Sequence, residues 1–481
     1  MDPEAIEHYL ADGHLRAEPF DGGFDGAAGG AACGDLVRFS LKIERGTVAA
    51  ISFAAEGCAV ARAAAAATAE LAEGAAVLEA AVIDPDRVAA ELGGVGPQGR
   101  HAVELAADAL ARALAGAAGS TLELASRPAR GKRVLVALSG GVDSAVAALR
   151  ERERGAEVVA VTLKLWSDQH TDSSKSCCSP LAVLGARGLA HSLGISHFTL
   201  DLEDAFRAQV VGGFVEGYRA GRTPNPCVVC NGELRIDAML ALSRRLGCAA
   251  LATGHYARLA DDGEGPLLSA AADPAKDQTY MLSGLRPASL ARLRFPLAEL
   301  TKSEVREIAA GAGLAVAEKS ESQDLCFLAG EGKRAFLARK GGIGERPGAV
   351  VDRQGRTLGE HSGHHQFTVG QRRGIGVAAA EPLYVLATDA GDNTVTVGPR
   401  EQLATSRVRV RSATLHRPGG RVDRVRLRYH AKPLACGLAG VPAGEHRELE
   451  LELREPALGV APGQTACLMS GEVVVGRATI A

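Results

Sequence analysis

The sequence predicts a multidomain α/β protein. We expect an N-terminal α+β domain, a central parallel sheet with helices on both faces, and a C-terminal antiparallel β-barrel. Three observations support this: the 481 residues suffice for about three domains, 46% hydrophobic and 23% charged residues are typical of a globular chain, and the residue pattern changes near positions 120 and 350. The same composition excludes a disordered or collagen-like chain.

Residues 1–118 are predicted to form the N-terminal domain. The Gly, Ser and Pro residues of segment 119–131 predict a linker after it. The elements expected in the domain are a strand hairpin at 36–58 that turns at Arg45-Gly46-Thr47, and helices at 59–73 and 98–116.

The middle of the chain alternates between apolar, β-branched runs and helical patterns, which predicts a parallel sheet. This domain spans residues 132–288, and a helical connector is expected over 289–348. The predicted strands lie at 132–138, 158–166, 197–202 and 249–255, with a helix at about 204–219.

Residues 349–481 alternate apolar and polar residues between Gly-containing turns, the pattern of a small antiparallel barrel. Eight arginines lie within 406–430 against one acid, Asp423, in a chain of net charge −3. Because alternate residues of a strand share a face, we expect a basic stripe that binds a nucleic-acid backbone. A solvated barrel face is the alternative.

Cysteine usage points to a reducing compartment. Ten cysteines are too few for a disulfide scaffold, and the pairs Cys177-Cys178 and Cys227/Cys230 favour redox or metal chemistry. The acidic N-terminus lacks an apolar signal region, and no apolar run approaches the roughly 18 residues that span a bilayer. We therefore expect a cytoplasmic protein that does not contact membranes.

The hexapeptide Ser139-Gly140-Gly141-Val142-Asp143-Ser144 follows a buried strand and opens a helix. Its glycines permit a tight turn, and its exposed amides can cradle phosphate together with the helix dipole. The hexapeptide resembles the pyrophosphate loop of N-type ATP pyrophosphatases, which cleave ATP between the α and β phosphates. The resemblance implies ATP as a substrate, and Mg²⁺ is expected to screen its phosphates.

Four further motifs follow in order: GRTPNPCVVCN (221–231), ATGHYAR (252–258), KDQTY (276–280) and FTVGQRRG (367–374). With the loop, they resemble the tRNA-specific 2-thiouridylase family over about 132–481. The resemblance implies an enzyme that converts the wobble uridine in the anticodon loop of certain tRNAs to 2-thiouridine, consuming ATP and a persulfide sulfur. The implied ATP contacts are Ala137, Leu138, Ser139, Gly140, Gly141, Val142, Asp143, Ser144, Leu163 and Gly254. The implied tRNA contacts are Asn225, Pro226, Cys227, His255, Lys276, Asp277, Gln278, Arg428, Tyr429 and Gln464.

Sulfur transfer to uridine needs an activated oxygen and an activated thiol. Adenylation makes the C2 oxygen part of AMP, a good leaving group, and a helix N-terminus favours a thiolate. Cys230 precedes a helix expected at 232–245, and the resemblance makes it the nucleophile. The same resemblance makes Cys326 the persulfide carrier and allows the two cysteines to close to a disulfide after transfer.

Cys227 leaves more than one route open. With Cys230 and Cys326 it supplies three thiolates, which can hold an iron–sulfur cluster with one open iron. We place the persulfide route first; a CxxC pair also suits zinc or a redox disulfide. Cys177-Cys178 is expected on a loop, as a sulfur-handling pair or a plain exposed loop. Three further cysteines are predicted to be core residues: Cys248, Cys436 and Cys467.

Residues 1–118 resemble the iron–sulfur scaffold domain of the NifU/IscU type, through GAACGD (30–35), Gly57-Cys58 and GRH (99–101). The candidate ligands of a cluster or zinc are Cys33, Asp35, Cys58 and His101. Ala102 stands where the third scaffold cysteine is expected, so a degenerate docking domain is the alternative. Tethering such a domain to a sulfur transferase raises the local concentration of the sulfur donor. The expected donor is a cysteine desulfurase or a relay protein.

Two rival functions remain open. One is another ligase or amidotransferase of the pyrophosphatase fold, which the paired cysteines and the arginine-rich barrel argue against. The other is an iron–sulfur carrier or RNA-binding protein with a vestigial ATP site, which the intact loop around Asp143 argues against.

Overall fold

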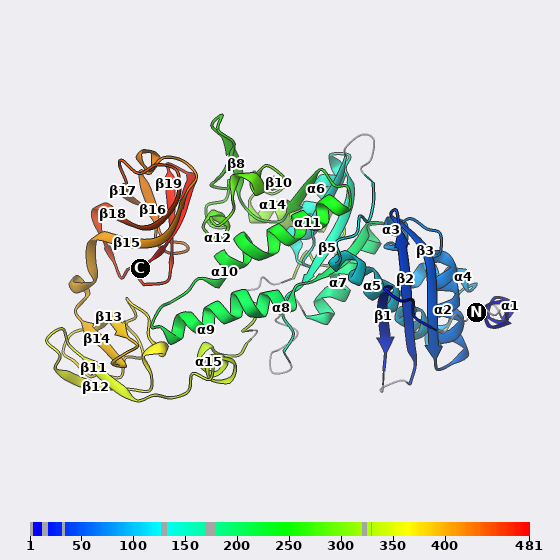
Figure 1. Cartoon of the computed structure of the whole chain (residues 1–481), viewed down its shortest axis with the longest axis horizontal. Coiled ribbons are helices and arrows are strands. Elements are labelled where there is room, and N and C mark those ends of the chain that lie inside the picture. The colour runs from blue at the N-terminus through cyan, green and yellow to red at the C-terminus, as the bar shows by residue number, and fades with distance from the viewer. Residues whose placement is uncertain are drawn as a thin grey trace.

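The computed structural model describes residues 3–11, 18–30, 34–126, 132–168, 179–319, 325–328 and 330–481. The N-terminal sheet and the C-terminal barrel lie at opposite ends of the long axis of the molecule, with the parallel sheet between them (Figure 1). None of the helices in the described ranges is long and apolar enough to cross a bilayer.

The N-terminal domain packs helices against a three-stranded antiparallel sheet. Its elements are α1 (Pro3–Ala11), β1 (Phe24–Gly29), β2 (Leu36–Glu44), β3 (Thr47–Glu56), α2 (Ala59–Ala72), α3 (Val77–Ala80), α4 (Pro85–Glu91) and α5 (Pro97–Gly119). The predicted hairpin and both long helices are confirmed. Arg45 and Gly46 turn the hairpin with φ of 52° and 78°. Gly26 lets α5 approach β1 closely, because a Cβ there would stand 2.2 Å from the nitrogen of Ala113.

The central domain is a parallel sheet with strand order β10-β7-β4-β5-β6, which confirms the predicted class. Its strands are β4 (Arg133–Ala137), β5 (Glu157–Lys164), β6 (Ser196–Asp201), β7 (Ala250–Thr253) and β10 (Leu293–Arg294). Its helices are α6 (Val142–Glu153), α7 (Pro180–Ser192), α8 (Glu203–Phe206), α9 (Gly212–Arg219), α10 (Pro226–Val229), α11 (Ile236–Arg245), α12 (Thr279–Leu282) and α13 (Pro287–Leu290). π-helical turns at Arg207–Val211 and Cys230–Arg235 join α8 to α9 and α10 to α11.

The connector contributes α14 (Lys302–Gly311) and α15 (Lys333–Gly341). The β-rich remainder consists of two sheets. The first is a four-stranded sheet of β11 (Gly348–Val351), β12 (Thr357–His361), β13 (Tyr384–Asp389) and β14 (Thr394–Gly398).

The second sheet is the barrel, which is antiparallel as predicted. Its strands are β15 (Ala404–Leu415), β16 (Arg424–Arg426), β17 (Leu434–Gly437), β18 (Gly444–Leu458), β19 (Thr465–Ser470) and β20 (Val473–Ile480). A hairpin from the central domain, β8 (Arg258–Asp261) and β9 (Pro266–Ser269), extends this sheet by pairing β9 with β20. The central domain and the barrel are therefore joined through one continuous sheet.

Candidate active site

The predicted phosphate loop joins the carboxyl end of β4 to the start of α6. Gly140 turns the chain with φ of 69°. The Oγ of Ser144 accepts a hydrogen bond from the Ser139 nitrogen at 3.1 Å and donates one to the Gly141 carbonyl at 2.9 Å. These bonds close the loop at the N-terminus of α6, the geometry that binds an anion through backbone amides and the helix dipole.

Gly254 lies directly against this loop, at the end of β7. A Cβ on Gly254 would stand 2.8 Å from both the Asp143 carbonyl carbon and the Ser144 nitrogen. Only glycine lets the two backbones come so close. Leu163, near the end of the neighbouring strand β5, is buried. The structure thus brings the sequence-predicted ATP contacts to one edge of the sheet.

The carboxylate of Asp143 is held by two residues that the sequence did not single out. Lys302 donates from Nζ to both carboxylate oxygens, at 2.7 and 2.8 Å, and the Tyr256 hydroxyl donates to Oδ1 at 2.9 Å. A third residue, Lys319, donates from Nζ to the Gly140 carbonyl at 2.9 Å. Two ammonium groups therefore lie beside the loop where a polyphosphate would bind.

A signal for Lys302 was present in the sequence. Thr301 and Glu304 form a capping box at the start of α14, and Lys302 is the first helical residue. A cation is disfavoured at a helix N-terminus because it opposes the dipole. A lysine at the first position of α14 therefore indicates that a carboxylate from another part of the fold stabilises it.

Cys230 lies inside a helix rather than before one, so the expected helix start at 232 is wrong. The helix begins with Pro226, and Asn225 is its N-cap, accepting from the Val228 nitrogen at 3.4 Å. Proline at the first helical position is a normal helix start. Cys230 is buried, whereas Cys227, one turn nearer the N-terminus, is partly exposed.

Cys326 is anchored by its neighbour. Phe327 is buried in an aromatic cluster, with ring centroids 5.1 Å from Phe214 and 5.2 Å from Phe336. Cys326 itself is partly exposed and packs against the same hydrophobic core that contains Cys230. The turn that carries Cys326 is therefore fixed by burial of an adjacent ring.

The three thiols predicted for sulfur chemistry come from two elements, the CxxC helix and the turn at Cys326. No disulfide links any cysteine within the described ranges, so the structure does not show the closure of Cys230 with Cys326 that is expected after sulfur transfer. The described residues also contain no group of three or more ligands able to hold a metal, so Cys227, Cys230 and Cys326 do not form a cluster site here. The physical reason is that a helix holds two of them and a separate turn holds the third.

The other cysteines divide clearly. As predicted, Cys248, Cys436 and Cys467 are buried in the core. Burial raises the pKa of the Cys248 and Cys467 thiols to about 12 and that of Cys436 to about 11. Cys177 and Cys178 lie outside the described residues.

Several residues predicted to contact tRNA lie together between the central domain and the barrel. Burial, with the nearby charge of Asp277, raises the pKa of Tyr429, whose charged neighbours also include Lys276 and Cys227. Tyr429 stacks near Tyr280, with centroids 6.1 Å apart. The structure thus assembles a partly exposed surface beside the CxxC helix.

Other residues predicted to contact tRNA form hydrogen bonds within the protein. Asp277 is buried and accepts from Arg426 at 2.8 Å, and Gln278 accepts from the Tyr256 nitrogen at 2.9 Å. Gln464 donates to the Thr223 carbonyl at 2.8 Å. Exposed Arg428 donates to the backbone carbonyls of residues 369 and 459.

The His255 ring lies just after β7, with its Nδ1 2.9 Å from the Oγ1 of Thr253. Burial lowers the pKa of His255 to about 3, so the ring is neutral at physiological pH.

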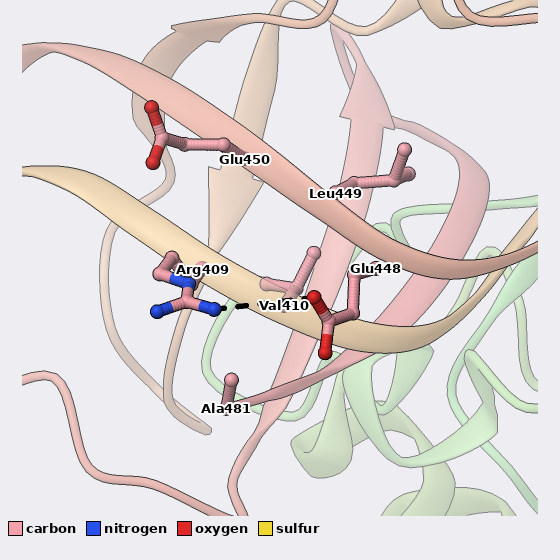
Figure 2. Close-up of a pocket in the computed structure, with 6 residues that line it drawn as sticks. All are labelled: Arg409, Val410, Glu448, Leu449, Glu450 and Ala481. Atoms are coloured by element: carbon pink, nitrogen blue, oxygen red, sulfur yellow. Dashed lines mark ion pairs between the residues drawn. The ribbon is translucent and has the colours of Figure 1, made fainter.

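The arginine stripe of β15 is largely neutralised by the neighbouring strand. Arg407 pairs with Glu450 at 3.7 Å and Arg409 with Glu448 at 3.9 Å. Figure 2 shows Arg409 and Glu448 side by side in a surface pocket on β15 and β18. The sequence pattern does not reveal these acidic partners, because β18 places a glutamate opposite each arginine from a distant part of the chain. Binding of a nucleic-acid backbone by this stripe stays a prediction.

Further arginines of the predicted stripe join the barrel to the central domain. Arg417 is buried and donates to both carboxylate oxygens of Asp262, at the tip of the β8–β9 hairpin. The Arg417 guanidinium holds the pKa of Asp262 well below its ordinary value. Arg421 adds a second contact to Asp262 at 3.2 Å.

The candidate metal site of the N-terminal domain is described in part. Cys58 caps α2 and donates from its nitrogen to Asp35 at 2.9 Å, and its Sγ lies 3.8 Å from the other carboxylate oxygen. Within the described residues, His101 does not complete a three-ligand group with them. Cys33 lies outside the described residues.

Family models match the chain from end to end. A NifU-like N terminal domain matches residues 6–121, a tRNA methyl transferase HUP domain 132–330, a tRNA methyl transferase PRC-barrel domain 334–399, and an aminomethyltransferase beta-barrel domain 401–480. A bifunctional protein NifU/MnmA from Rubrobacter xylanophilus is 45% identical over 492 residues, covering 100% of this chain and 98% of that protein.

The chain belongs to the bifunctional NifU/MnmA family. Two tRNA-specific 2-thiouridylases MnmA are also similar. That of Sorangium cellulosum is 42% identical over 76% of this chain and 96% of its own length, and that of Magnetococcus marinus is 40% identical over 72% and 98%. The predicted fold class and both family resemblances are thereby confirmed.

Proposed function

We propose that this chain is an ATP-dependent tRNA sulfurtransferase that makes 2-thiouridine at the wobble position, acting in the cytoplasm. The proposal is carried by one observation: a preformed anion loop, with Asp143 held between Lys302 and Tyr256, in a chain 45% identical over its full length to a NifU/MnmA protein. The proposal also keeps the domain boundaries predicted from the sequence, which are 1–118, 132–288, 289–348 and 349–481.

The nucleotide loop supports adenylation of the substrate. Loop amides and the N-terminus of α6 would hold the pyrophosphate of ATP, with the adenine beside Leu163. The C2 oxygen of uridine attacks the α-phosphorus, forming an oxygen–phosphorus bond as pyrophosphate leaves. Asp143 offers one carboxylate to Mg²⁺, which fits a metal bound mainly through phosphates; when bound, Mg²⁺ would neutralise developing charge.

Sulfur transfer is the second half of the proposed reaction. A sulfur donor of the persulfide class loads Cys326, and the terminal sulfur attacks C2 as AMP departs. The Cys230 thiolate then attacks the Cys326 sulfur, forming a Cys230–Cys326 disulfide as 2-thiouridine leaves. An external thiol reductant must reduce that disulfide before the next turnover. The proposed wobble-base contacts are residues 225–227, and the proposed tRNA surface is the cluster around Lys276 and Tyr429.

The structure gives less support to a function that depends on bound zinc or an iron–sulfur cluster. Cys58 and Asp35 give only two ligands among the described residues, and Ala102 replaces a third thiol, so no step is assigned to a cluster or zinc there. Likewise, no cluster chemistry is assigned to the three catalytic-site thiols.

The test is mass spectrometry of tRNA nucleosides after incubation with ATP and a persulfide donor. We expect 2-thiouridine with the wild-type chain and none with Cys230→Ser or Cys326→Ser. Cys436→Ala, which removes a buried barrel thiol, is the matched control and should retain activity. AMP release with a small carboxylic acid but without tRNA would favour the rival ligase function, and full activity of both serine variants would contradict the assigned sulfur route.

A further inference from the structure

The NifU-like domain is packed onto the ATP-binding domain over an extended apolar contact. Buried side chains of both domains belong to one continuous hydrophobic core, including Leu110 and Leu114 of α5 with Phe198 and Leu200 of β6. Figure 1 shows α3 and α5 lying beside the central domain. Since β6 is an edge strand of the parallel sheet, this packing covers an edge that is otherwise open to pairing.

Hydrogen bonds fix the register of this contact. The His197 nitrogen on β6 donates to the Ala81 carbonyl at 3.2 Å, and the Ser196 hydroxyl donates to the Leu78 carbonyl at 2.7 Å. The His191 ring Nε2 lies 3.1 Å from the same Ala81 oxygen. Polar groups of the edge strand are therefore satisfied by carbonyls of α3 and of its C-cap residue.

Charged and backbone contacts extend the interface along α5. Arg187 on α7 pairs with Asp108 at 2.6 Å, and both side chains are largely buried. Arg245 donates to the carbonyls of Ala117 and Ala118 at the end of α5, and its own carbonyl accepts from the nitrogens of residues 124 and 125. These contacts hold the two domains together directly, whereas a flexible tether would connect them only through the linker.

A short chain of buried hydrogen bonds leads from this interface to the nucleotide loop. The His197 Nε2 lies 2.8 Å from the Thr162 Oγ1, and that hydroxyl donates to the Leu138 carbonyl at 2.7 Å. Because the hydroxyl has one proton and gives it to Leu138, the imidazole is the donor to Thr162. Leu138 is the residue directly before Ser139, where the loop begins.

We propose that the NifU-like domain is a fixed part of the ATP-binding domain, and that its docking on β6 positions the nucleotide loop through His197, Thr162 and the carbonyl of Leu138. This inference rests on the proposed function of the loop. It differs from the expectation that tethering alone raises the local concentration of the sulfur donor. It also places α2, whose N-cap is Cys58, in the domain at the opposite end of the long axis from the barrel (Figure 1).

The first test asks whether the domains are docked or only tethered. A specific protease site replaces residues 127–131 in the full chain, and the cleaved protein is run on a size-exclusion column. Docking predicts that the two fragments elute together; separation of the fragments at micromolar concentration would overturn the proposal. This result does not depend on nucleotide binding, so it stands apart from the proposed function.

The second test concerns positioning of the loop. Thr162→Val removes the hydroxyl with little change of shape and should weaken binding of a non-hydrolysable ATP analogue by about tenfold. Thr68→Val is the matched control, because Thr68 is equally buried and donates to the Ala64 carbonyl at 2.7 Å inside α2. We expect both variants to lose similar thermal stability and only Thr162→Val to bind the analogue more weakly. Equal binding by the two variants would overturn the role of Thr162.

The third test connects the interface to the loop. Arg187→Glu places a like charge against Asp108 and should both loosen the cleaved complex and weaken analogue binding, while the double variant Asp108→Arg/Arg187→Glu should restore both. Weaker docking with unchanged analogue binding would show that docking does not position the loop. Failure of the wild-type chain to bind the analogue would instead contradict the proposed function.

Discussion

The nucleotide loop and the cysteine pair are assembled in different ways. The loop is made of consecutive residues between one strand and one helix, and its closing hydrogen bonds lie within Ser139–Ser144. Cys230 and Cys326 lie on different elements, a helix capped by Asn225 and a turn anchored by Phe327. The ATP site is therefore built from one local segment, whereas the two thiols come from elements far apart in the chain.

This difference implies that the two half-reactions are separable. Changes around the loop should lower pyrophosphate release, and changes around the Cys326 turn should lower sulfur transfer after adenylation has occurred. The following predictions test this separation in order of decreasing effect.

Gly254→Ala should have the largest effect. The added Cβ would meet the backbone of Asp143 and Ser144 at 2.8 Å, so the loop must shift. We expect binding of an ATP analogue, measured by calorimetry, to weaken roughly 100-fold, about 2.7 kcal/mol. Gly188→Ala is the control, since a Cβ there meets nothing within 4 Å. Unchanged binding in Gly254→Ala would show that the loop does not hold the nucleotide.

Lys302→Met should reduce adenylation without disturbing the thiols. The substitution removes two hydrogen bonds to Asp143 and leaves its carboxylate without that cation. We expect tRNA-dependent pyrophosphate release to fall by about tenfold or more, on the order of 1.5–3 kcal/mol for charged hydrogen bonds. Lys164→Met, which breaks an exposed pair with Asp201, serves as the control. A similar loss in both variants would argue against a specific role for Lys302.

Phe327→Leu should affect the opposite half-reaction. Shrinking the buried ring loosens the turn beside Cys326 and costs about 1–2 kcal/mol of stability. Single-turnover assays should show 2-thiouridine formation slowed roughly threefold to fivefold, with pyrophosphate release unchanged. Phe39→Leu shrinks a similarly buried ring in the N-terminal sheet and should lose stability alone. Equal slowing by both variants would contradict the anchoring role.

The smallest effect per residue is a pH dependence of stability, which comes from three buried histidines. Burial lowers the pKa of His197 and His255 to about 3 and of His416 to about 4, from 6.5. The unfolded chain takes up these protons first as pH falls, so their contribution to stability is complete above about pH 6.5. It is lost as pH falls from there to the folded pKa, about 3 for His197 and His255 and about 4 for His416. Chemical denaturation at pH 7.5 and 5.5 should show a loss of about 1 kcal/mol per histidine. An unchanged denaturation midpoint would contradict the burial of these histidines in their neutral form.

Local chemistry explains which predictions from the sequence hold. The hairpin turn at Arg45-Gly46, the alternating strands of the central sheet and the phosphate loop all depend on neighbouring residues, so periodicity and glycine placement reveal them. The sequence pattern misplaces the start of the CxxC helix. Pro226 is typical of a loop, but proline also suits the first turn of a helix, and the helix begins there.

The sequence by itself determined the fold class, the family and the phosphate loop, because these depend on patterns that neighbouring residues carry. Only the tertiary structure decided the partners of long side chains: the lysine that holds Asp143, the glutamates that neutralise the β15 arginines, and the docking of the N-terminal domain on β6. Such contacts join residues far apart in the chain, and their choice depends on burial and approach of whole elements, which no local pattern records.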